Sequence, residues 1–545
     1  MNTAVWHHHI PLLPSGKKKK CGVRLIGWRA SRPSLPLRLV VRVATPGAVG
    51  GRCLLGWIDS SLNFETQDQQ HRFERTLLVI FLLTLPLLNP WVRGDGVGYY
   101  AYVRAPLIEH NLDFTHDYQS ANDSFREGRL DENGQPKAEF RTSTGHLDNH
   151  CTAGPAMLWS PFLLVAHGSV LLARAWGSKV PADGFSAPYR YAMALATGVY
   201  GFLALLLSYR LALKYAAPLW SFIATIAVWW ASSLPVYMYF NPSWSHAHSA
   251  FVVALFLWYW DATRERRSLT QWLLLGMIVG LMLDVYYANL MVVSVLAVEA
   301  LVNYAHILRS QRPCSPSLQD TLTRHLLFGL MVCAVMIPTF VSRAIVYGGP
   351  LETGYPSLRN FLWRSPVFFS VLFSSNHGLL SWTPLLGFSI LGLLFFAFRL
   401  PKVGIPFFTA LGAFYLLISM YPDWAGISSY GNRFFVSLTP LFILGLAYLL
   451  ERVVERFAQP RVAVAVSCVV LACFVLWNLG LMYQWGIHLI PARGPISFRQ
   501  VTYNQFYVVP EQLASRLRSY FFRRGDLMRQ IEQQDIKQLN SPAER

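Results

Sequence analysis

Long apolar runs separated by short polar loops dominate the chain from residue 75 onwards. The first run, Leu77–Leu88, ends at Asn89-Pro90-Trp91. Because a helix needs roughly 20 apolar residues to cross a bilayer, this alternation predicts an all-α fold, a polytopic transmembrane helical bundle of about 11–13 spans. The later spans are expected near residues 153–175, 189–210, 217–240, 246–260, 271–283, 288–304, 326–347, 378–398, 405–421, 434–450 and 462–482.

Two polar segments flank or interrupt these runs. Residues 91–152 form a long predicted outer loop after the first span, which holds about a third of all Asp and Glu residues. Within this loop, residues 99–108 are typical of an amphipathic segment that lies along the membrane interface. The polar tail 483–545 is expected to form short surface helices on the outer face. The chain therefore divides into an N-terminal arm (1–74), a transmembrane domain (75–482) and this tail.

The composition supports a membrane protein. Hydrophobic residues make up 53% of the 545 residues and charged residues 14%, against about 25% charged in ordinary soluble domains. These values exclude soluble α/β enzymes, coiled coils and disordered chains. Seven cysteines occur without a C-x-x-C pair or a zinc-like His/Cys cluster, so neither a disulfide framework nor a structural metal is expected.

The net charge of +18 is concentrated at the N-terminus, where residues 1–58 carry ten Lys and Arg residues and no acid. Two interpretations of this arm are open. It is either a disordered segment that is dispensable or a misassigned start, or a basic segment held on the cytoplasmic lipid surface. The remaining positive charge lies between apolar spans, where orientation in the membrane explains it better than nucleic-acid binding does. No nucleic-acid partner is therefore expected.

Lys and Arg counts also predict the orientation, because basic loops stay on the cytoplasmic side. The basic loops contain Arg264, Arg266, Arg267, Arg309, Arg312, Arg324, Arg399, Lys402, Arg452, Arg456 and Arg461. The loops between them, 241–246, 284–289, 348–377 and 422–433, are then outside. Simple alternation fails once between residues 150 and 260, and a re-entrant or broken helix near Pro155–Pro161 or Pro235–Pro242 would restore it.

Acids, histidines and arginines gather on the predicted outer side, and the string Arg93-Gly94-Asp95-Gly96-Val97-Gly98-Tyr99-Tyr100 is the most informative part. Glycines on both sides of Asp95 permit a tight turn and the close approach of a ligand. A phosphate-binding loop is a poor interpretation, since neither a preceding strand nor a G-K-[ST] sequence is present. A plain turn with a capping Asp and a functional carboxylate both remain open.

Several strings, in their order along residues 75–520, together resemble the GT-C superfamily of membrane glycosyltransferases. They come closest to a bacterial branch related to the Rgt-like and protein-mannosyltransferase-like proteins. The strings are Gly94-Asp95-Gly96, Asn111-Leu112-Asp113-Phe114, residues 154–162, Ser245-His246-Ala247-His248, residues 373–384, and residues 424–435. The chain departs from the family pattern at Asp284-Val285-Tyr286-Tyr287, where an Arg-rich motif is common, and at Asp117, where Glu is commoner. Both departures leave the donor sugar undefined.

The resemblance implies that Asp95 is the catalytic base, which removes the proton of an acceptor hydroxyl as that hydroxyl attacks the anomeric carbon. The leaving lipid phosphate needs cations, and Arg433 fits because a guanidinium matches phosphate geometry. An Arg at this position can alternatively anchor a lipid headgroup. Further substrate-binding candidates, with structural roles as their alternatives, are Arg104, His246, His248, Asp113, Asp117 and His377.

The sequence therefore predicts an inverting hexosyl- or pentosyltransferase of the bacterial inner membrane, with its active site on the periplasmic face. Its partners would be a polyprenyl-phosphate sugar donor, a lipid, glycan or protein acceptor, and membrane lipids. No cofactor is expected, although a divalent cation between Asp95 and His246 stays open. The alternatives are a lipid-linked sugar flippase or transporter, and a non-catalytic membrane protein of the same fold.

Overall fold

The computed structural model describes residues 51–309 and 317–540, with only the backbone for residues 51–66 and 539. Most of the predicted N-terminal arm, residues 1–50, lies outside the described residues. Over the described ranges the chain is helical, and its β-type pairing is limited to two isolated bridges, Leu130 with Pro136 and Arg141 with Leu147. The predicted all-α class is confirmed.

Twenty-one α-helices are assigned in the described part of the chain, joined by short 3₁₀ and π segments. They are α1 (Gly51–Thr84), α2 (Asp95–Arg104), α3 (Thr115–Gln119), α4 (Asp123–Arg129), α5 (Gly154–Ala175), α6 (Ala187–Ala212), α7 (Pro218–Trp230), α8 (His246–Thr263), α9 (Leu269–Val285), α10 (Ser294–Arg309), α11 (Leu318–Val335), α12 (Ile337–Tyr347), α13 (Phe368–Phe373), α14 (Leu379–Trp382), α15 (Leu385–Arg399), α16 (Pro401–Met420), α17 (Thr439–Val454), α18 (Pro460–Gly486), α19 (Phe498–Tyr503), α20 (Val509–Phe522) and α21 (Arg524–Leu539).

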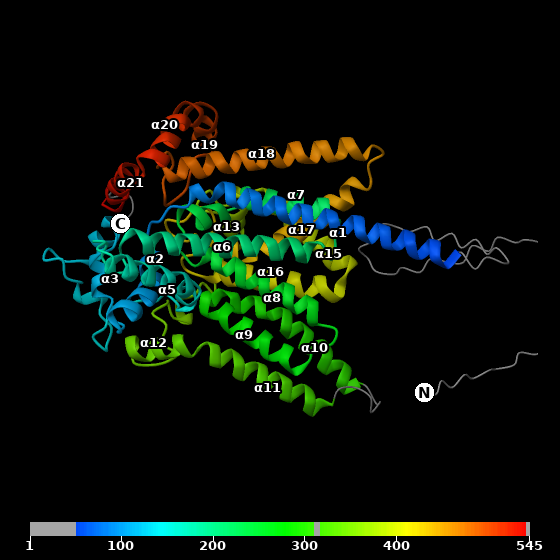
Figure 1. The fold of residues 1–545 in the computed structure, drawn as a ribbon, viewed down its shortest axis with the longest axis horizontal. Helices are drawn as coiled ribbons and strands as arrows, with labels where there is room; N and C mark the ends of the chain where they lie inside the picture. Colours follow the sequence, from blue (N-terminus) through cyan, green and yellow to red (C-terminus); the bar gives the residue numbers. More distant parts are fainter. Residues whose placement is uncertain (1–50, 310–316, 541–545) are drawn as a thin grey trace, which may run out of the picture.

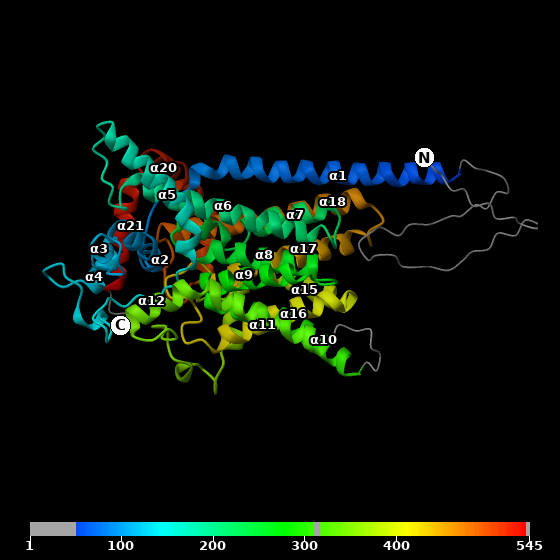
Figure 2. The same cartoon turned by 60° about the horizontal axis from the view of Figure 1, so that its bottom comes forward.

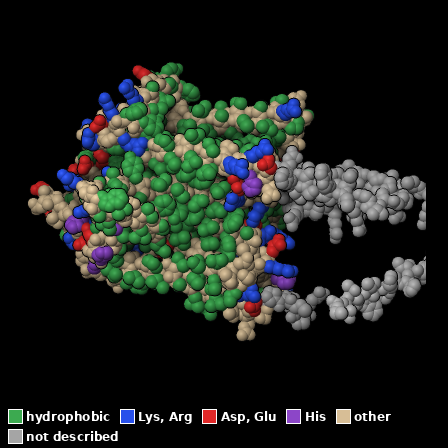
Figure 3. Space-filling view, in the orientation of Figure 1, with side chains coloured by type: hydrophobic (Ala, Val, Ile, Leu, Met, Phe, Trp, Pro, Cys, Tyr) green, Lys and Arg blue, Asp and Glu red, His purple; other side chains and the backbone are tan. Residues whose placement is uncertain are grey.

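The longer helices run side by side and form a bundle, with α2, α3, α4 and α21 grouped at one end (Figures 1 and 2). We call this end the loop end, because it carries the 91–152 loop. The surface over the middle of the bundle is largely hydrophobic, and charged side chains gather towards both ends (Figure 3). An apolar band between two polar ends is the pattern of an integral membrane protein.

Six helical segments in the described residues are long and apolar enough to cross a membrane, or up to seven if α11 and α12 form one bent span. This number is below the predicted 11–13 spans, because several expected spans are short. The helices α7, α9 and α15 are apolar but contain only 13, 17 and 15 residues. They pack against the longer helices nonetheless, and α15 with α17 and α9 with α11 are among the most extensive pairings in the bundle.

Helix α5 accounts for the failure of simple alternation in the N-terminal half. It is long and apolar enough to cross a membrane, yet both of its ends lie at the loop end. Its first residue, Gly154, packs against the backbone where α9 ends, at Val285. Near its other end, the His167 imidazole is 2.7 Å from the Tyr189 hydroxyl at the start of α6, and Ile108 of the outer loop packs nearby. The chain therefore enters α6 from the same end at which it entered α5.

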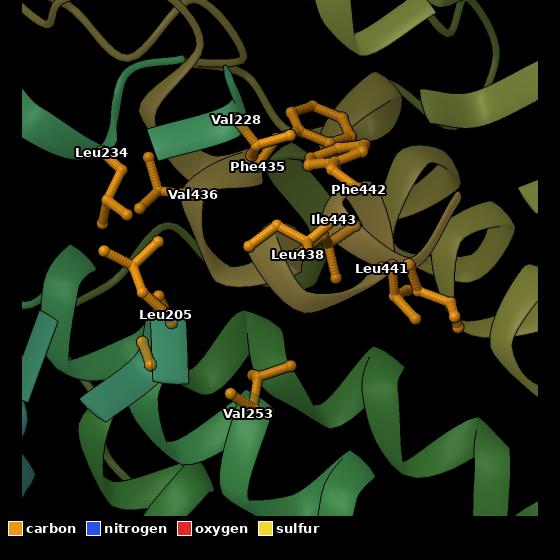
Figure 4. Close-up of a cluster of buried hydrophobic side chains, with 14 of the residues drawn as sticks. Leu205, Val228, Leu234, Val253, Phe435, Val436, Leu438, Leu441, Phe442 and Ile443 are labelled. Atoms are coloured by element: carbon orange, nitrogen blue, oxygen red, sulfur yellow. The ribbon is translucent and has the colours of Figure 1, made fainter. Parts of the chain in front are cut away.

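Helix α17 forms the centre of the bundle. Its residues from Thr439 to Tyr448 are all buried, and apolar side chains from α6, α7 and α8 converge on it (Figure 4). Its backbone lies very close to α15, since a β-carbon added to Gly392 would lie 1.9 Å from the Gly445 carbonyl oxygen. Small residues that allow such close backbone approach are typical of helix pairs in membranes. This packing fixes the segment that precedes α17, which contains Arg433.

Candidate active site

The residues around Asp95 hold it at the start of α2. Gly94 has a φ of +53°, a left-handed conformation that costs glycine little. Gly96 lies so close to Ser243 that an added β-carbon would be 2.0 Å from the serine hydroxyl. Trp244 donates a hydrogen bond from its indole to the Arg93 carbonyl at 3.0 Å. The glycines therefore serve a tight turn and the close packing of Ser243 against α2, and the close approach of a ligand stays a prediction.

Arg433 begins the 3₁₀ segment Arg433–Leu438, directly before α17. The preceding loop turns at Gly426 and Gly431, which both have positive φ. The Asn432 side chain donates to the Trp424 carbonyl at 3.1 Å and closes this loop. The loop thus presents the arginine from the rigid centre of the bundle.

Asp95 and Arg433 are 338 positions apart in the sequence and form an ion pair. The Asp95 Oδ2 atom is 2.6 Å from the Arg433 Nη1 atom. The guanidinium also lies over the Trp244 ring, 4.5 Å from its centroid. Arg433 is 11% exposed, whereas the Asp95 side chain is 38% exposed. The carboxylate therefore remains accessible from the cavity while the arginine behind it is fixed.

The pKa of Asp95 lies below its ordinary value. Partial burial raises the pKa of this carboxyl, but the charges of Arg433 and His150, the hydrogen bond from Arg433 and the charge of His246 together lower it by more. An adjacent guanidinium favours the ionised form of a carboxyl group. Asp95 is therefore a carboxylate at neutral pH, able to accept a hydrogen bond or a proton.

The ion pair faces a cavity of about 310 Å³ at the loop end, a volume at the lower end of the usual range for ligand sites. Segments far apart in the sequence form its walls: the turn at Asp95, the 91–152 loop, the loop before Arg433 and the C-terminal region. Its lining includes Arg93, Asp95, Ser124, Phe125, Arg129, Phe140, Asp148, His150, Cys151, Trp244, Ser428, Arg433, His488, Arg493, Ile531, Asp535 and Gln538. Apolar side chains such as Phe125, Phe140 and Ile531 therefore line the cavity together with several charged groups.

Arg104 and Asp117 lie outside this cavity and pair with each other. The Arg104 Nε and Nη2 atoms each donate to an Asp117 oxygen at 2.7 Å. Glu109 accepts a third hydrogen bond from Arg104, also at 2.7 Å. The Arg104 and Asp117 side chains are only 1% and 2% exposed. This buried cluster joins α2, the segment that follows it and α3, and its geometry supports a structural role.

Asp113 is exposed and stabilises the start of α3. Its Oδ1 atom accepts hydrogen bonds from the backbone amide and the hydroxyl of Thr115, at 3.0 and 2.6 Å. It does not line the cavity. This position matches the capping alternative that the sequence left open.

The three predicted histidines are buried at different places. His246 begins α8 and packs its ring against Tyr237 and Tyr286, and it is close enough to Asp95 to influence the charge of that carboxylate. His248, two residues later, packs against Trp159 and Tyr200. The two rings therefore have different neighbours, as expected for positions two apart on a helix.

His377 supports the loop that leads to Arg433. Its Nδ1 atom is 2.8 Å from the Ala425 carbonyl oxygen and 3.2 Å from the Ser429 hydroxyl. It adopts a φ of +60°, which is uncommon outside glycine. Its ring contacts Trp382 edge to face. The geometry favours positioning of the loop over direct contact with a substrate.

The C-terminal helix α21 forms a wall of the cavity, a feature that the sequence did not predict. Its Asp535 pairs with Arg93 at 2.5 Å and with His488 at 2.9 Å. Its Glu532 accepts hydrogen bonds from the Asn122 side chain at 3.0 and 3.1 Å. The tail thus folds back onto the 91–152 loop, and both lie at one end of the bundle. The only hint in the sequence is that Arg93 directly precedes Gly94 and Asp95.

Among the residues that the structure describes, no three His, Cys, Asp or Glu side chains are grouped as a metal site would require. A divalent cation between Asp95 and His246, which the sequence left open, would therefore need ligands from the substrate or from water.

The fold and the site define an integral membrane protein, a polytopic helical bundle with a charged cavity at one end. No family model matches the chain, and no curated protein matches it. Two solved structures are similar to it. One is ArnT from Cupriavidus metallidurans bound to undecaprenyl phosphate, with 14% identity, a TM-score of 0.42 and coverage of 80% of this chain and 72% of that chain.

The other is the archaeal oligosaccharyltransferase AglB from Archaeoglobus fulgidus, in complex with an inhibitory peptide and a dolichol-phosphate. It shares 14% identity at a TM-score of 0.38, and the match covers 85% of this chain and 56% of that chain. At these identities and TM-scores the similarities assign no function.

Proposed function

We propose that the protein is a membrane glycosyltransferase of the GT-C type, which moves a sugar from a polyprenyl-phosphate donor to an acceptor hydroxyl. The observation that carries this proposal is the contact between Asp95 and Arg433 at 2.6 Å at the wall of a cavity of about 310 Å³. A carboxylate base beside a phosphate-binding cation is what this transfer requires. The sequence resemblance supports the same two residues.

The reaction is a single displacement at the anomeric carbon. The acceptor oxygen forms a bond to this carbon while the bond from the carbon to the phosphate oxygen breaks, and that electron pair leaves with the phosphate. The acceptor proton passes to Asp95, a step that a positioned base accelerates by about 10²–10⁴-fold. Attack opposite to the leaving group inverts the configuration of the anomeric carbon. Arg433 stabilises the departing phosphate through a planar, permanently charged group.

The ion pair also couples donor binding to the strength of the base. Arg433 lowers the pKa of Asp95 while the two residues are paired. A donor phosphate competes for the same guanidinium and brings a negative charge close to Asp95. Both effects raise the pKa of the carboxyl, because a like charge disfavours ionisation. Asp95 thus becomes a stronger base once the donor is bound.

We place the active site on the outer, periplasmic face of a bacterial inner membrane. The Arg-rich loops at 264–267 and 452–461 support this assignment, because such loops favour the cytoplasmic side. In the bundle, Arg210 in the last turn of α6 pairs with Glu74, and Lys214 just after α6 pairs with Asp261. These pairs belong to the end opposite Asp95. Reporter fusions test the orientation. Phosphatase activity is expected for a fusion at Pro510 and not for one at Arg456, and the reverse pattern would overturn the assigned orientation.

The transporter alternative would place its main charged groups near the middle of the membrane. Here the ionisable groups that line cavities lie at the two ends of the bundle, around Asp95 at the loop end and around Arg267 at the other end, which favours transfer at an interface. A non-catalytic relative would keep the ion pair without turnover. One assay separates the transferase, the transporter and the non-catalytic protein. It uses purified protein in proteoliposomes, supplied with radiolabelled polyprenyl-phosphate sugars and candidate acceptors. Labelled product supports the transferase, movement of label across the bilayer without product supports the transporter, and neither supports the non-catalytic protein.

EDTA added to the same assay tests the divalent cation. We expect transfer to continue, because Arg433 already supplies the positive charge at the phosphate. Loss of transfer with EDTA and its recovery with Mg²⁺ or Mn²⁺ would instead support a cation held at Asp95 and His246.

A further inference from the structure

Two arginines line the cavity without a carboxylate partner. Of the four arginines in its wall, Arg433 pairs with Asp95 and Arg93 pairs with Asp535. Within residues 51–309 and 317–540, Arg129 and Arg493 form no ion pair. Their positive charges are therefore not neutralised by the protein as described.

Both guanidinium groups are held in place by neutral contacts. Arg129, the last residue of α4, lies over the Phe125 ring at 4.1 Å and near the Phe140 ring at 5.5 Å from their centroids. Arg493 donates from Nε to the Ser428 hydroxyl at 2.6 Å. Its two Nη atoms make no hydrogen bond within the described residues. An oriented planar guanidinium is suited to bind a carboxylate or phosphate through two parallel hydrogen bonds.

Each acid that lines the cavity already has another partner, and none of them forms an ion pair with Arg129 or Arg493 within the described residues. Asp95 is engaged with Arg433. Asp535 bridges Arg93 and His488, and the pKa of Asp535 stays below its ordinary value because these two groups outweigh the effect of its burial. Asp148 accepts a hydrogen bond from the Tyr347 hydroxyl. The cavity therefore retains two free cations in addition to the pair that we assign to catalysis.

We propose that Arg129 and Arg493 form a binding site for a second anionic group, a phosphate or carboxylate, distinct from the donor phosphate at Arg433. This site would select substrates that carry such a group, either on the acceptor or on the transferred sugar. Its assignment to acceptor or sugar rests on the proposed function, whereas anion binding at the two arginines does not.

Binding is tested first, without turnover. The thermal unfolding midpoint of the purified full-length protein in detergent is measured with glucose 1-phosphate, and with methyl glucoside as a neutral probe, at matched ionic strength. A ligand that binds the folded state raises the midpoint. We expect only the phosphate to do so. The variants are Arg129→Gln, Arg493→Gln and the double variant, with Arg126→Gln as control.

Arg126 is a suitable control because it lies on the same helix, is exposed, and pairs with Asp123 at 3.7 Å. Each single variant should weaken phosphate binding by about ten-fold, the loss expected for hydrogen bonds to a charged group, and the double variant should abolish the shift. Arg126→Gln should behave as wild type. An unchanged shift in the double variant, or loss of the shift in Arg433→Gln alone, would overturn the proposal.

Turnover then identifies the source of the anion. The KM for an anionic acceptor is compared with the KM for its neutral analogue, in the wild type and in the double variant. A rise of about ten-fold for the anionic acceptor only assigns the site to the acceptor. A rise in the KM for a donor that carries a uronic acid assigns it to the sugar. If the wild type transfers no sugar, the proposed function fails, while the thermal measurement still decides on anion binding.

Discussion

Replacing Arg433 by Ala should reduce the use of the donor more than it destabilises the fold. Arg433 sits at the start of the segment before α17 and touches Asp95 and Trp244. Its removal takes away the charged partner that we assign to the donor phosphate. Hydrogen bonds to a charged group contribute about 1.5–3 kcal/mol. With about 1.4 kcal/mol per ten-fold change, kcat/KM for the donor should fall roughly 10- to 150-fold.

Two further properties of this variant follow from the ion pair. Arg433→Lys should recover only part of the loss, because a compact ammonium replaces a two-pronged guanidinium. In Arg433→Ala, Asp95 also loses the main group that lowers its pKa, so the pKa rises. Because the base acts as a carboxylate, activity should then decline at a higher pH during acidification than it does in the wild type.

The assay measures initial rates against donor concentration at several pH values, in parallel with thermal unfolding in detergent. If kcat/KM for the donor changes by less than about two-fold in a folded Arg433→Ala protein, Arg433 is a headgroup anchor or a structural residue. If activity declines at the same pH in Arg433→Ala as in the wild type during acidification, Asp95 does not act through its carboxylate.

Three other variants separate structure from chemistry. Arg104→Met should lower stability by about 3–5 kcal/mol, because it leaves the Asp117 carboxylate buried without its partner, while the folded fraction keeps its kcat; normal stability would contradict the structural role. Asp535→Asn should loosen α21 from Arg93, so that limited proteolysis cuts this helix sooner and the acceptor KM rises by a few-fold. Equal rates of proteolysis in the variant and the wild type would show that Asp535 does not hold α21 at the wall of the cavity. His377→Ala should raise the donor KM by about five-fold through loss of one hydrogen bond, with recovery in His377→Asn, and equal KM values in all three proteins would refute it.

Much of the fold could be predicted from the sequence, because hydropathy reports directly which segments avoid water. The position of the central helix α17 and the long loop after the first span both follow from apolar runs. Helix α5 was harder to place, because its composition suits a span while its contacts return it to the loop end. Hydropathy measures affinity for lipid and does not record the direction in which a helix travels.

The candidate site was predictable only in part. Asp95 was proposed from a family resemblance and Arg433 from the cation that a leaving phosphate needs, and the two prove to be in contact. The wall formed by α21 was not predicted, because an ion pair between Arg93 and Asp535 leaves no local pattern in either segment. The free arginines at positions 129 and 493 were missed for the same reason, since their lack of a partner is a property of the folded protein. Arg104, which the sequence offered as a substrate-binding candidate, is paired with Asp117 outside the cavity.

The most direct test of the account is sugar transfer by Asp95→Asn. This change keeps the size and the turn preference of the residue, but an amide cannot accept the acceptor proton. Asp113→Asn is the matched control, because Asp113 lies in the same loop, is exposed and contacts only Thr115 through its side chain. We predict that Asp95→Asn transfers sugar at least about 10²-fold more slowly than wild type, while Asp113→Asn changes the rate by less than about three-fold, the scale of one exposed hydrogen bond. Wild-type transfer by a folded Asp95→Asn protein would make Asp95 a turn residue and contradict the assigned active site.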